Sequence, residues 1–161
     1  DQLVARIQAD IEFTRVYQDL GSHLPTWHRL SDCVADLTIP DHILLVITGG
    51  EWQIYADPLL RKVFENLIDN SLRHGGAVSR ISITAEEQDG GLLVSFEDDG
   101  VGIASDEKEL IFDRGYGKNT GIGLFFIKEI LGITHIRIKE TGQAGQGVRF
   151  EMIVPKGMFK R

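Results

Sequence analysis

The sequence has little cysteine, no long apolar run and no excess of positive charge. Its one cysteine, Cys33, excludes an internal disulfide and favours a reducing, cytoplasmic setting. No apolar run approaches the roughly 20 residues of a membrane-spanning helix. The first residues form no signal peptide, which leaves open a membrane anchor elsewhere in a parent protein. The net charge of −7 argues against general binding of nucleic acid or anionic membranes.

The length indicates one folded domain with a short appendage. A chain of 161 residues can bury a sizeable core. From residue 1 to about 20, apolar residues recur three and four apart until Gly21 ends the pattern, which predicts a helix. That helix has no partner in the next few residues, so we expect it to pack on chain outside this sequence or on a second copy. We therefore divide the chain into residues 1–20 and 21–161 and expect an excerpt from a longer protein.

Alternating helix and hairpin signals predict the fold class. Long helices are predicted over 1–20, 57–74 and 121–132, with short ones near 30–37 and 107–112. Predicted hairpins join strands over 43–48 and 52–55, over 81–85 and 93–96, and over 135–140 and 148–154. This order favours an α+β fold, a two-layer α/β sandwich with helices on one face of a mixed, mainly antiparallel sheet.

The helix predicted over 57–74 carries an unusual polar strip. At 100° per residue, Asn66, Asn70 and Arg73 fall together, one turn apart, with His74 beside them, next to an apolar stripe. Asparagine is a poor helix-interior residue, so two of them stacked at i and i+4 need a reason. The amides could bond back to carbonyls or to a neighbouring loop. Alternatively they could serve Mg²⁺, which takes oxygen ligands and shares substrate phosphates, with Arg73 as a fork on phosphate oxygens.

Three glycine clusters follow this helix. In the first, Asp98 stands at a strand end before Gly100 and Gly102; its carboxylate suits an amino donor, and the glycines allow close approach of a ligand. The second, Gly121-x-Gly123, opens a helix whose free N–H groups form an anion site. The third, Gly145-x-Gly147, precedes the last strand. Taken singly, the first cluster is at least as typical of an Asp-Gly turn, and the second and third are more typical of a plain helix start and a hairpin turn.

Together, the order and spacing of these motifs resemble the ATP-binding domain of sensor histidine kinases, within the GHKL family that shares the Bergerat fold. The resemblance covers roughly residues 40 to 155. Ordered matches of this kind are more specific than a lone glycine motif. The matching stretches are an N box, Asn66-x-x-x-Asn70-x-x-Arg73-His74; a first glycine box, Asp98 to Ile103; a phenylalanine box, Ile111-Phe112-Asp113-Arg114; and later glycine boxes, Gly121 to Leu124 and Gly145 to Phe150.

The resemblance implies ATP and Mg²⁺ as cofactors. Asn70 would ligate Mg²⁺ with Asn66 in support, Arg73 would contact phosphate, and these three would form the catalytic set. His74 would lie along the adenine or ribose. Asp98 would accept from the adenine amino group, and Gly100 and Gly102 would make room for the purine. The remaining implied nucleotide contacts are Ile103 of the first glycine box, Lys118 and Thr120 of a short lid over 114–120, Gly121, Ile122, Gly123 and Leu124 at the helix start, and Val148, where many relatives carry threonine.

The resemblance also implies a partial catalytic unit. The phosphoacceptor box, a helix with His followed by an acidic residue, is missing, since His23 precedes Leu24-Pro25 and His28 precedes Arg29. The chain would transfer the ATP γ-phosphate to a histidine on a segment absent here, for onward transfer to a response regulator aspartate. That histidine would lie on a phosphoacceptor helix of the same protein or of a dimer mate. Residues 1–20 resemble the second helix of the dimerisation hairpin, so we expect a homodimer at full length.

Two other functions stay open. One is a GHKL-type ATP hydrolase, but such enzymes carry a glutamate base four residues before the metal asparagine, where this chain has Asn66. The other is a non-catalytic nucleotide-binding or dimerisation module.

Overall fold

A five-stranded sheet with helices on one face forms the body of the molecule. In this computed structural model the described residues are 1–116 and 123–161. The helices are α1 (Gln2–Asp19), α2 (Leu30–Val34), α3 (Leu60–His74) and α4 (Gly123–Gly132), with a 3₁₀ turn η1 (Leu110–Phe112). The strands are β1 (Thr26–Arg29), β2 (Leu44–Thr48), β3 (Gln53–Ala56), β4 (Arg80–Gln88), β5 (Gly91–Asp98), β6 (Arg137–Glu140), β7 (Arg149–Val154) and β8 (Phe159–Lys160).

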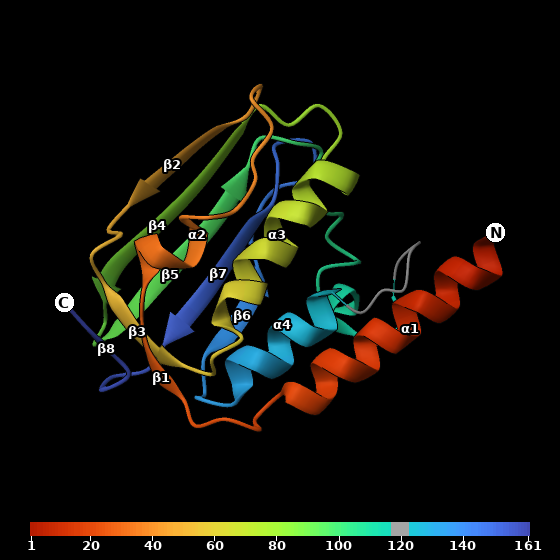
Figure 1. Ribbon diagram of the computed structural model, residues 1–161. Coiled ribbons are helices and arrows are strands. Elements are labelled where there is room, and N and C mark those ends of the chain that lie inside the picture. The colour runs from red at the N-terminus through yellow and green to blue at the C-terminus, as the bar shows by residue number, and fades with distance from the viewer. Residues whose placement is uncertain (117–122) are drawn as a thin grey trace.

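The strand order of the main sheet is β2-β4-β5-β7-β6. Only β2 and β4 run parallel; the other neighbours are antiparallel. Helices α3 and α4 lie across the same face of this sheet (Figure 1). The predicted α+β class, with helices on one face of a mixed sheet, is confirmed. A second, smaller antiparallel sheet, β1-β3-β8, was not predicted.

The predicted hairpin between strands 43–48 and 52–55 is wrong. Both strands form, but β2 pairs with β4, whereas β3 pairs with β1 and β8. The chain does turn at Gly49, which has φ +78°, and a Cβ there would lie 2.3 Å from the Ala85 carbonyl oxygen. The turn then leads into β3 of the small sheet, and Leu30, at the start of α2, donates its N–H to the carbonyl of Trp52, just before β3, at 2.9 Å. Two glycines specify a reversal of direction but not the strand that pairs afterwards.

The other two predicted hairpins are confirmed. Asp89 and Gly90, with φ 51° and 80°, form the two-residue turn between β4 and β5, and positive φ at both positions is the type I′ geometry that matches strand twist. The second hairpin joins β6 to β7. Alternate residues of β5 are buried against the helices, so Leu92, Val94, Phe96 and Asp98 share the helix-covered face.

Helix α3 buries the apolar stripe that the sequence predicts. Its core residues are at most 4% exposed: Leu60, Val63, Phe64, Leu67 and Ile68. Full burial of such a side chain stabilises the fold by about 1.5–3 kcal/mol. The helix begins at Leu60, later than the sequence indicates. The buried carboxylate of Asp57 accepts the Leu59 N–H at 2.9 Å and the Gly21 N–H at 3.2 Å, and so joins the end of α1 to the start of α3.

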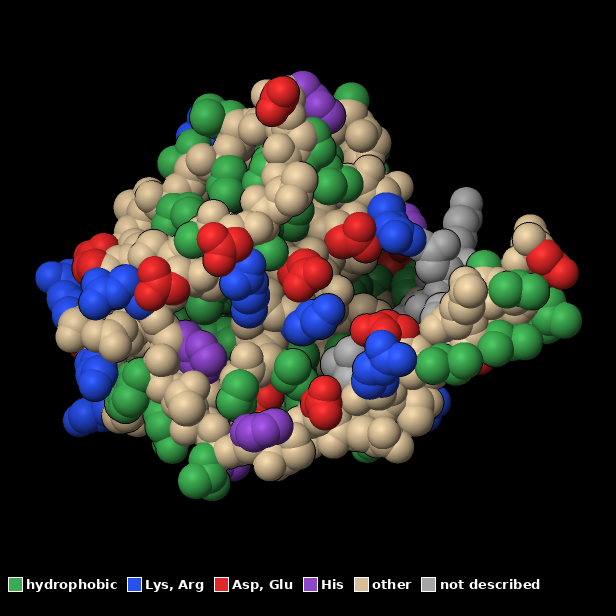
Figure 2. Space-filling model, in the orientation of Figure 1, with side chains coloured by type: hydrophobic (Ala, Val, Ile, Leu, Met, Phe, Trp, Pro, Cys, Tyr) green, Lys and Arg blue, Asp and Glu red, His purple; other side chains and the backbone are tan. Residues whose placement is uncertain are grey.

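Helix α1 contacts the body near its C-terminal end and projects from it at the other end (Figure 1). The rings of Tyr17 and Phe126 of α4 lie 6.3 Å apart. Toward the N-terminus an apolar row stays 49–65% exposed and is visible as a green stripe in Figure 2, formed by Leu3, Val4, Ile7 and Ile11. None of the described helices is long and apolar enough to cross a membrane.

Candidate functional site

The carboxylate of Asp98 lies at the centre of the site. It occupies the next inward position of β5 after Phe96, where the pattern would otherwise place a core residue, and it is 7% exposed. One oxygen, Oδ1, accepts the N–H groups of Gly100 and Val148, both at 3.0 Å. The other, Oδ2, accepts the Ser71 hydroxyl at 2.6 Å. An ionised carboxylate oxygen accepts about two hydrogen bonds, so Oδ2 keeps one position for a ligand donor.

The first and last glycine clusters lie against each other. Gly102 has φ +73°, and a Cβ there would lie 2.8 Å from the Gln143 oxygen and 2.9 Å from the Gly147 oxygen. Gly145 donates its N–H to the Val101 carbonyl at 2.6 Å. The structure therefore brings together two motifs that lie some forty residues apart in the sequence, and Val148 joins them through Asp98.

Gly100 packs against the end of α3. A Cβ at Gly100 would lie 2.3 Å from the Gly75 carbonyl oxygen, and the same oxygen accepts the Val101 N–H at 2.9 Å. The missing side chain thus lets the loop approach the helix. Whether Gly100 also makes room for a purine stays a prediction.

The asparagine strip of α3 faces the start of α4. Asn66 and Asn70 are half-buried, and a Cβ placed on Gly123 would lie 4.0 Å from the Asn70 Oδ1. Gly123, where α4 begins, and Leu124 are half-buried as well. The side chain of Asn70 is therefore placed beside a helix N-terminus, where free N–H groups favour an anion.

Arg73 and His74 lie at the exposed end of the strip. The Arg73 guanidinium pairs with Asp69 at 3.0 Å, and both side chains are more than half exposed. Such a pair contributes little stability, so Arg73 can exchange Asp69 for a phosphate at small cost. His74 is the last residue of α3 and is exposed.

The donors fit Mg²⁺ only as a site shared with a ligand. Within residues 1–116 and 123–161, no group of three or more His, Cys, Asp or Glu side chains could hold a metal alone. A hard cation would need the amide oxygen of Asn70 together with ligand oxygens and water, which is how Mg²⁺ is commonly bound.

The lid is only partly described. Lys118, Thr120, Gly121 and Ile122 lie outside the described residues. Before them, Ile103 packs against the core, and Phe112 of the phenylalanine box meets Phe150 of β7 with ring centroids 6.2 Å apart. Desolvation and the neighbouring Glu107 raise the pKa of Tyr116.

Two residues at the site were missed by sequence reasoning. Ser71 lies on the buried side of α3, four residues after Leu67, and a serine in that stripe signals a polar partner across the interface. Gly75 follows the helix predicted over 57–74 and was not assigned to the site, but its carbonyl accepts the Val101 N–H of the first glycine loop.

Asp99, beside Asp98, has a structural role that gives a pH prediction. It accepts the Ser79 hydroxyl at 2.5 Å and the N–H groups of Ser79 and Arg80 at 2.8 and 3.1 Å. These bonds lower its pKa from 3.8 to about 2. Because the folded pKa is depressed, the stabilisation is complete above the unfolded pKa of 3.8 and is lost as the pH falls through about 2.

We therefore expect Asp99→Asn to be less stable than the wild type by a constant amount above about pH 4, with a difference that shrinks toward pH 2. Urea unfolding of both chains across this pH range measures it. Asp41→Asn, at an exposed position before β2, is the control. A difference that does not change with pH would contradict the role assigned to Asp99.

The fold and the placement of these motifs are those of a Bergerat-type ATP-binding domain. Residues 56–158 match the family described as histidine kinase-, DNA gyrase B-, and HSP90-like ATPase, and the chain belongs to this family. The resemblance to a GHKL ATP-binding domain with the Bergerat fold is confirmed by this match.

The similar curated proteins are sensor kinases. The alginate biosynthesis sensor protein KinB of Pseudomonas aeruginosa is 36% identical over 101 residues, which are 60% of this chain and 17% of KinB. The sensor histidine kinase ZraS of Escherichia coli O157:H7 is 33% identical over 113 residues, which are 68% of this chain and 25% of ZraS. The chain thus spans a quarter or less of the length of these two relatives.

Solved structures share the fold. The nucleotide-free catalytic domain of histidine kinase ThkA superposes with a TM-score of 0.69 at 24% identity, over 83% of this chain and 99% of that domain. Full-length ShkA in complex with AMPPNP gives a TM-score of 0.69 at 23% identity, over 83% of this chain and 31% of ShkA.

Proposed function

We propose that this chain binds Mg·ATP between α3, the start of α4 and the two glycine loops, and transfers the γ-phosphoryl group to a histidine outside this sequence. The full protein then passes the phosphoryl group to an aspartate of a response regulator. The observation that carries the proposal is the Asp98 carboxylate, which is buried, held by three donors and left with one acceptor position.

The purine end of the nucleotide binds at Asp98. The free position on Oδ2 accepts the adenine amino group, and Ser71, Gly100 and Val148 hold the carboxylate in that orientation. Gly102, Ile103 and Val148 line the base, and His74 lies along the adenine or ribose. A buried acceptor discriminates well, because a base without the amino group leaves the carboxylate unpaired.

The phosphate end binds at the asparagine strip. Asn70, supported by Asn66, provides the oxygen ligand for Mg²⁺, which neutralises charge on the phosphates and on the transferred group when bound. Arg73 leaves Asp69 and contacts phosphate oxygens as a fork. Lys118 and Thr120 of the lid and the amides from Gly121 to Leu124 complete the phosphate contacts. Phosphoryl transfer depends mainly on such positioning and charge stabilisation.

The absence of a glutamate base on the strip favours a kinase over a hydrolase. The position four residues before Asn70 is Asn66, and an amide cannot take a proton from water at neutral pH. The incoming histidine needs less activation, because a neutral imidazole already has a lone pair on nitrogen.

Helix α1 is proposed as the second helix of a dimerisation and phosphoacceptor hairpin. Its exposed apolar row, Leu3 to Ile11, is long enough to pack along another helix. The partner helix bears the histidine and belongs to the same protein or to the other subunit of a homodimer.

Calorimetry and a turnover assay on this chain test the function. We expect Mg·ATP to bind, with steady hydrolysis at the level of a no-enzyme blank, because the strip carries Asn66 where a hydrolase carries its glutamate base. Steady turnover that Asn66→Ala removes would favour the hydrolase. No binding at millimolar Mg·ATP would leave a non-catalytic module.

A further inference from the structure

Glu140, the last residue of β6, is a buried carboxylate that the nucleotide contacts do not use. It stands opposite Phe150 of β7 and therefore points to the helix-covered face, and its side chain has no exposed surface. A carboxylate in such a place is costly unless it is paired and hydrogen-bonded. Its Oε2 accepts the N–H of Gly142 at 3.1 Å and that of Arg149 at 2.9 Å, and its Oε1 meets the Lys108 ammonium.

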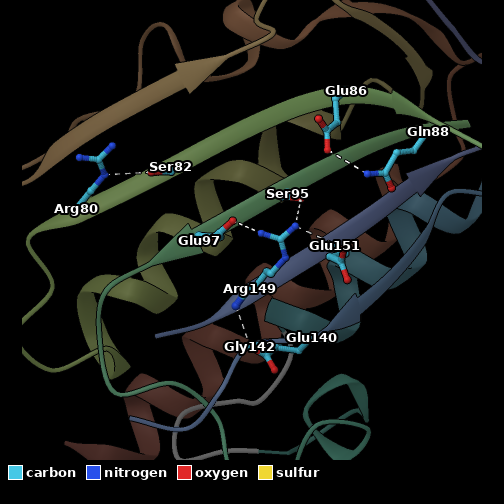
Figure 3. A network of polar contacts seen from close by, with 10 residues as sticks. All are labelled: Arg80, Ser82, Glu86, Gln88, Ser95, Glu97, Glu140, Gly142, Arg149 and Glu151. Carbon is cyan, nitrogen blue, oxygen red and sulfur yellow. Dashed lines mark hydrogen bonds and ion pairs between the residues drawn. The ribbon is translucent and has the colours of Figure 1, made fainter. Parts of the chain in front are cut away.

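The two amides bound by Glu140 are the two ends of the turn that joins β6 to β7. The carboxylate therefore holds the first and last residues of the turn 142–149 together. Figure 3 shows Arg149 contributing to both sides of the sheet: its guanidinium meets Glu97 and Ser95, while its backbone meets Glu140. Three residues of the turn are glycines, which have wide conformational freedom, so its shape depends on hydrogen bonds of this kind.

The same turn holds Asp98. Val148 donates its N–H to the Asp98 carboxylate at 3.0 Å, and Gly145 donates to the Val101 carbonyl at 2.6 Å. Through its ion pair with Glu140, Lys108 attaches the stretch between the first glycine loop and η1 to this turn. The Lys108 side chain is only 22% exposed. The Lys108–Glu140 ion pair thus connects the stretch before η1 to the turn between β6 and β7.

We propose that Glu140, paired with Lys108, is a positioning residue for recognition of the adenine amino group, an inference that rests on the proposed function. The carboxylate fixes the turn, the turn fixes the Val148 amide, and that amide orients Asp98. If the turn relaxes, Asp98 loses the Val148 N–H, one of its three donors. Its carboxylate can then rotate, and the free acceptor position no longer has a fixed direction. A purely structural role would lower stability without changing which base is preferred.

The test compares two ligands that differ in the amino group alone: ATP and purine riboside triphosphate, each with Mg²⁺, by calorimetry. The wild type should bind ATP about tenfold more tightly, as expected for one hydrogen bond to a charged acceptor. Glu140→Gln removes the charge that strengthens these bonds, and its new NH₂ group faces either the Lys108 ammonium or the two N–H groups, so the hold on the turn weakens in both orientations. We expect the preference to fall to about twofold, and hydrogen exchange of the Val148 amide to accelerate about tenfold in the ligand-free chain.

Two further variants sharpen the result. Glu140→Asp keeps the charge beside Lys108 but is one methylene too short to reach both amides. The same loss of preference for ATP over purine riboside triphosphate is expected. This variant replaces Glu140→Gln in the test if Glu140→Gln does not fold. Glu151→Gln is the matched control, because Glu151 lies on the same hairpin and pairs with the Arg149 guanidinium at 3.7 Å, on the opposite face. Its preference for ATP should equal that of the wild type.

An unchanged preference in folded Glu140 variants, or an equal loss in Glu151→Gln, would overturn the proposal. If the wild type binds neither nucleotide, the proposed function fails, and an unchanged exchange rate at Val148 would then show separately that Glu140 does not position the turn.

Discussion

Asp98→Asn should bind Mg·ATP about 100-fold more weakly than the wild type and still fold. The change is isosteric. The remaining oxygen can accept the Gly100 and Val148 N–H groups, and the Ser71 hydroxyl can rotate to accept from the new NH₂. The adenine amino group, however, now meets a donor in place of an acceptor. Loss of a hydrogen bond to a charged group costs about 1.5–3 kcal/mol, or roughly 10- to 150-fold in affinity.

Asp98→Asn should also bind a base that carries an acceptor in place of the amino group better, relative to ATP, than the wild type does. Inosine triphosphate carries a carbonyl oxygen where ATP carries the amino group, so the ratio of ATP to inosine triphosphate affinity should fall in Asp98→Asn. Calorimetry with both nucleotides measures this ratio, and urea unfolding checks the fold. Asp99→Asn is the control, because that carboxylate holds Ser79 and Arg80; its ratio should stay at the wild-type value. An unchanged ratio in Asp98→Asn would remove Asp98 from the base site.

The polar strip of α3 was predictable because its pattern is local. Helical spacing alone places Asn66, Asn70 and Arg73 on one strip and the apolar residues on another, and the structure buries that second set. Asp98 was predictable for a similar reason: it follows an alternating strand in phase with the inward positions, and glycines come directly after it.

The partners of these residues were not predictable, because they come from distant segments. Ser71 and Asp98 are 27 residues apart, and Val148 is 50 residues from Asp98. Glu140 ends a short strand in which Arg137 and Lys139 lie on one face and Ile138 lies on the face of Glu140. One apolar neighbour is a weak signal for a buried carboxylate, and the register with Phe150 reveals that Glu140 points inward. Pairing between strands depends on the whole sheet, which a window of sequence does not contain.

The small sheet β1-β3-β8 was also not predictable from local sequence. Strands β1 and β8 are four and two residues long, with no more than partial burial, so their sequences carry almost no periodic signal. They form because β3 offers edges on both sides, after the Gly49 turn has directed the chain away from β2.

Asn70→Ala should remove most of the effect of Mg²⁺ on ATP affinity. In the wild type we expect ATP to bind about tenfold or more tightly with Mg²⁺ than with EDTA, because the ion would link the ATP phosphates to Asn70, and even changes to the outer partners of metal ligands typically cost 10- to 100-fold. The variant should show nearly equal affinities in both conditions. Its fold should persist, because Asn70 is half-buried and alanine is the better helix former by up to about 0.7 kcal/mol.

The outcome separates metal ligation from a packing role for Asn70. Loss of packing between α3 and α4 would weaken ATP with and without Mg²⁺ alike, whereas loss of a ligand acts only when the metal is present. Glu65→Gln, an exposed change one turn earlier on α3, is the matched control and should keep the full effect of Mg²⁺. If Asn70→Ala keeps that effect too, the ion is held elsewhere, and Asn70 faces Gly123 for reasons of helix packing alone.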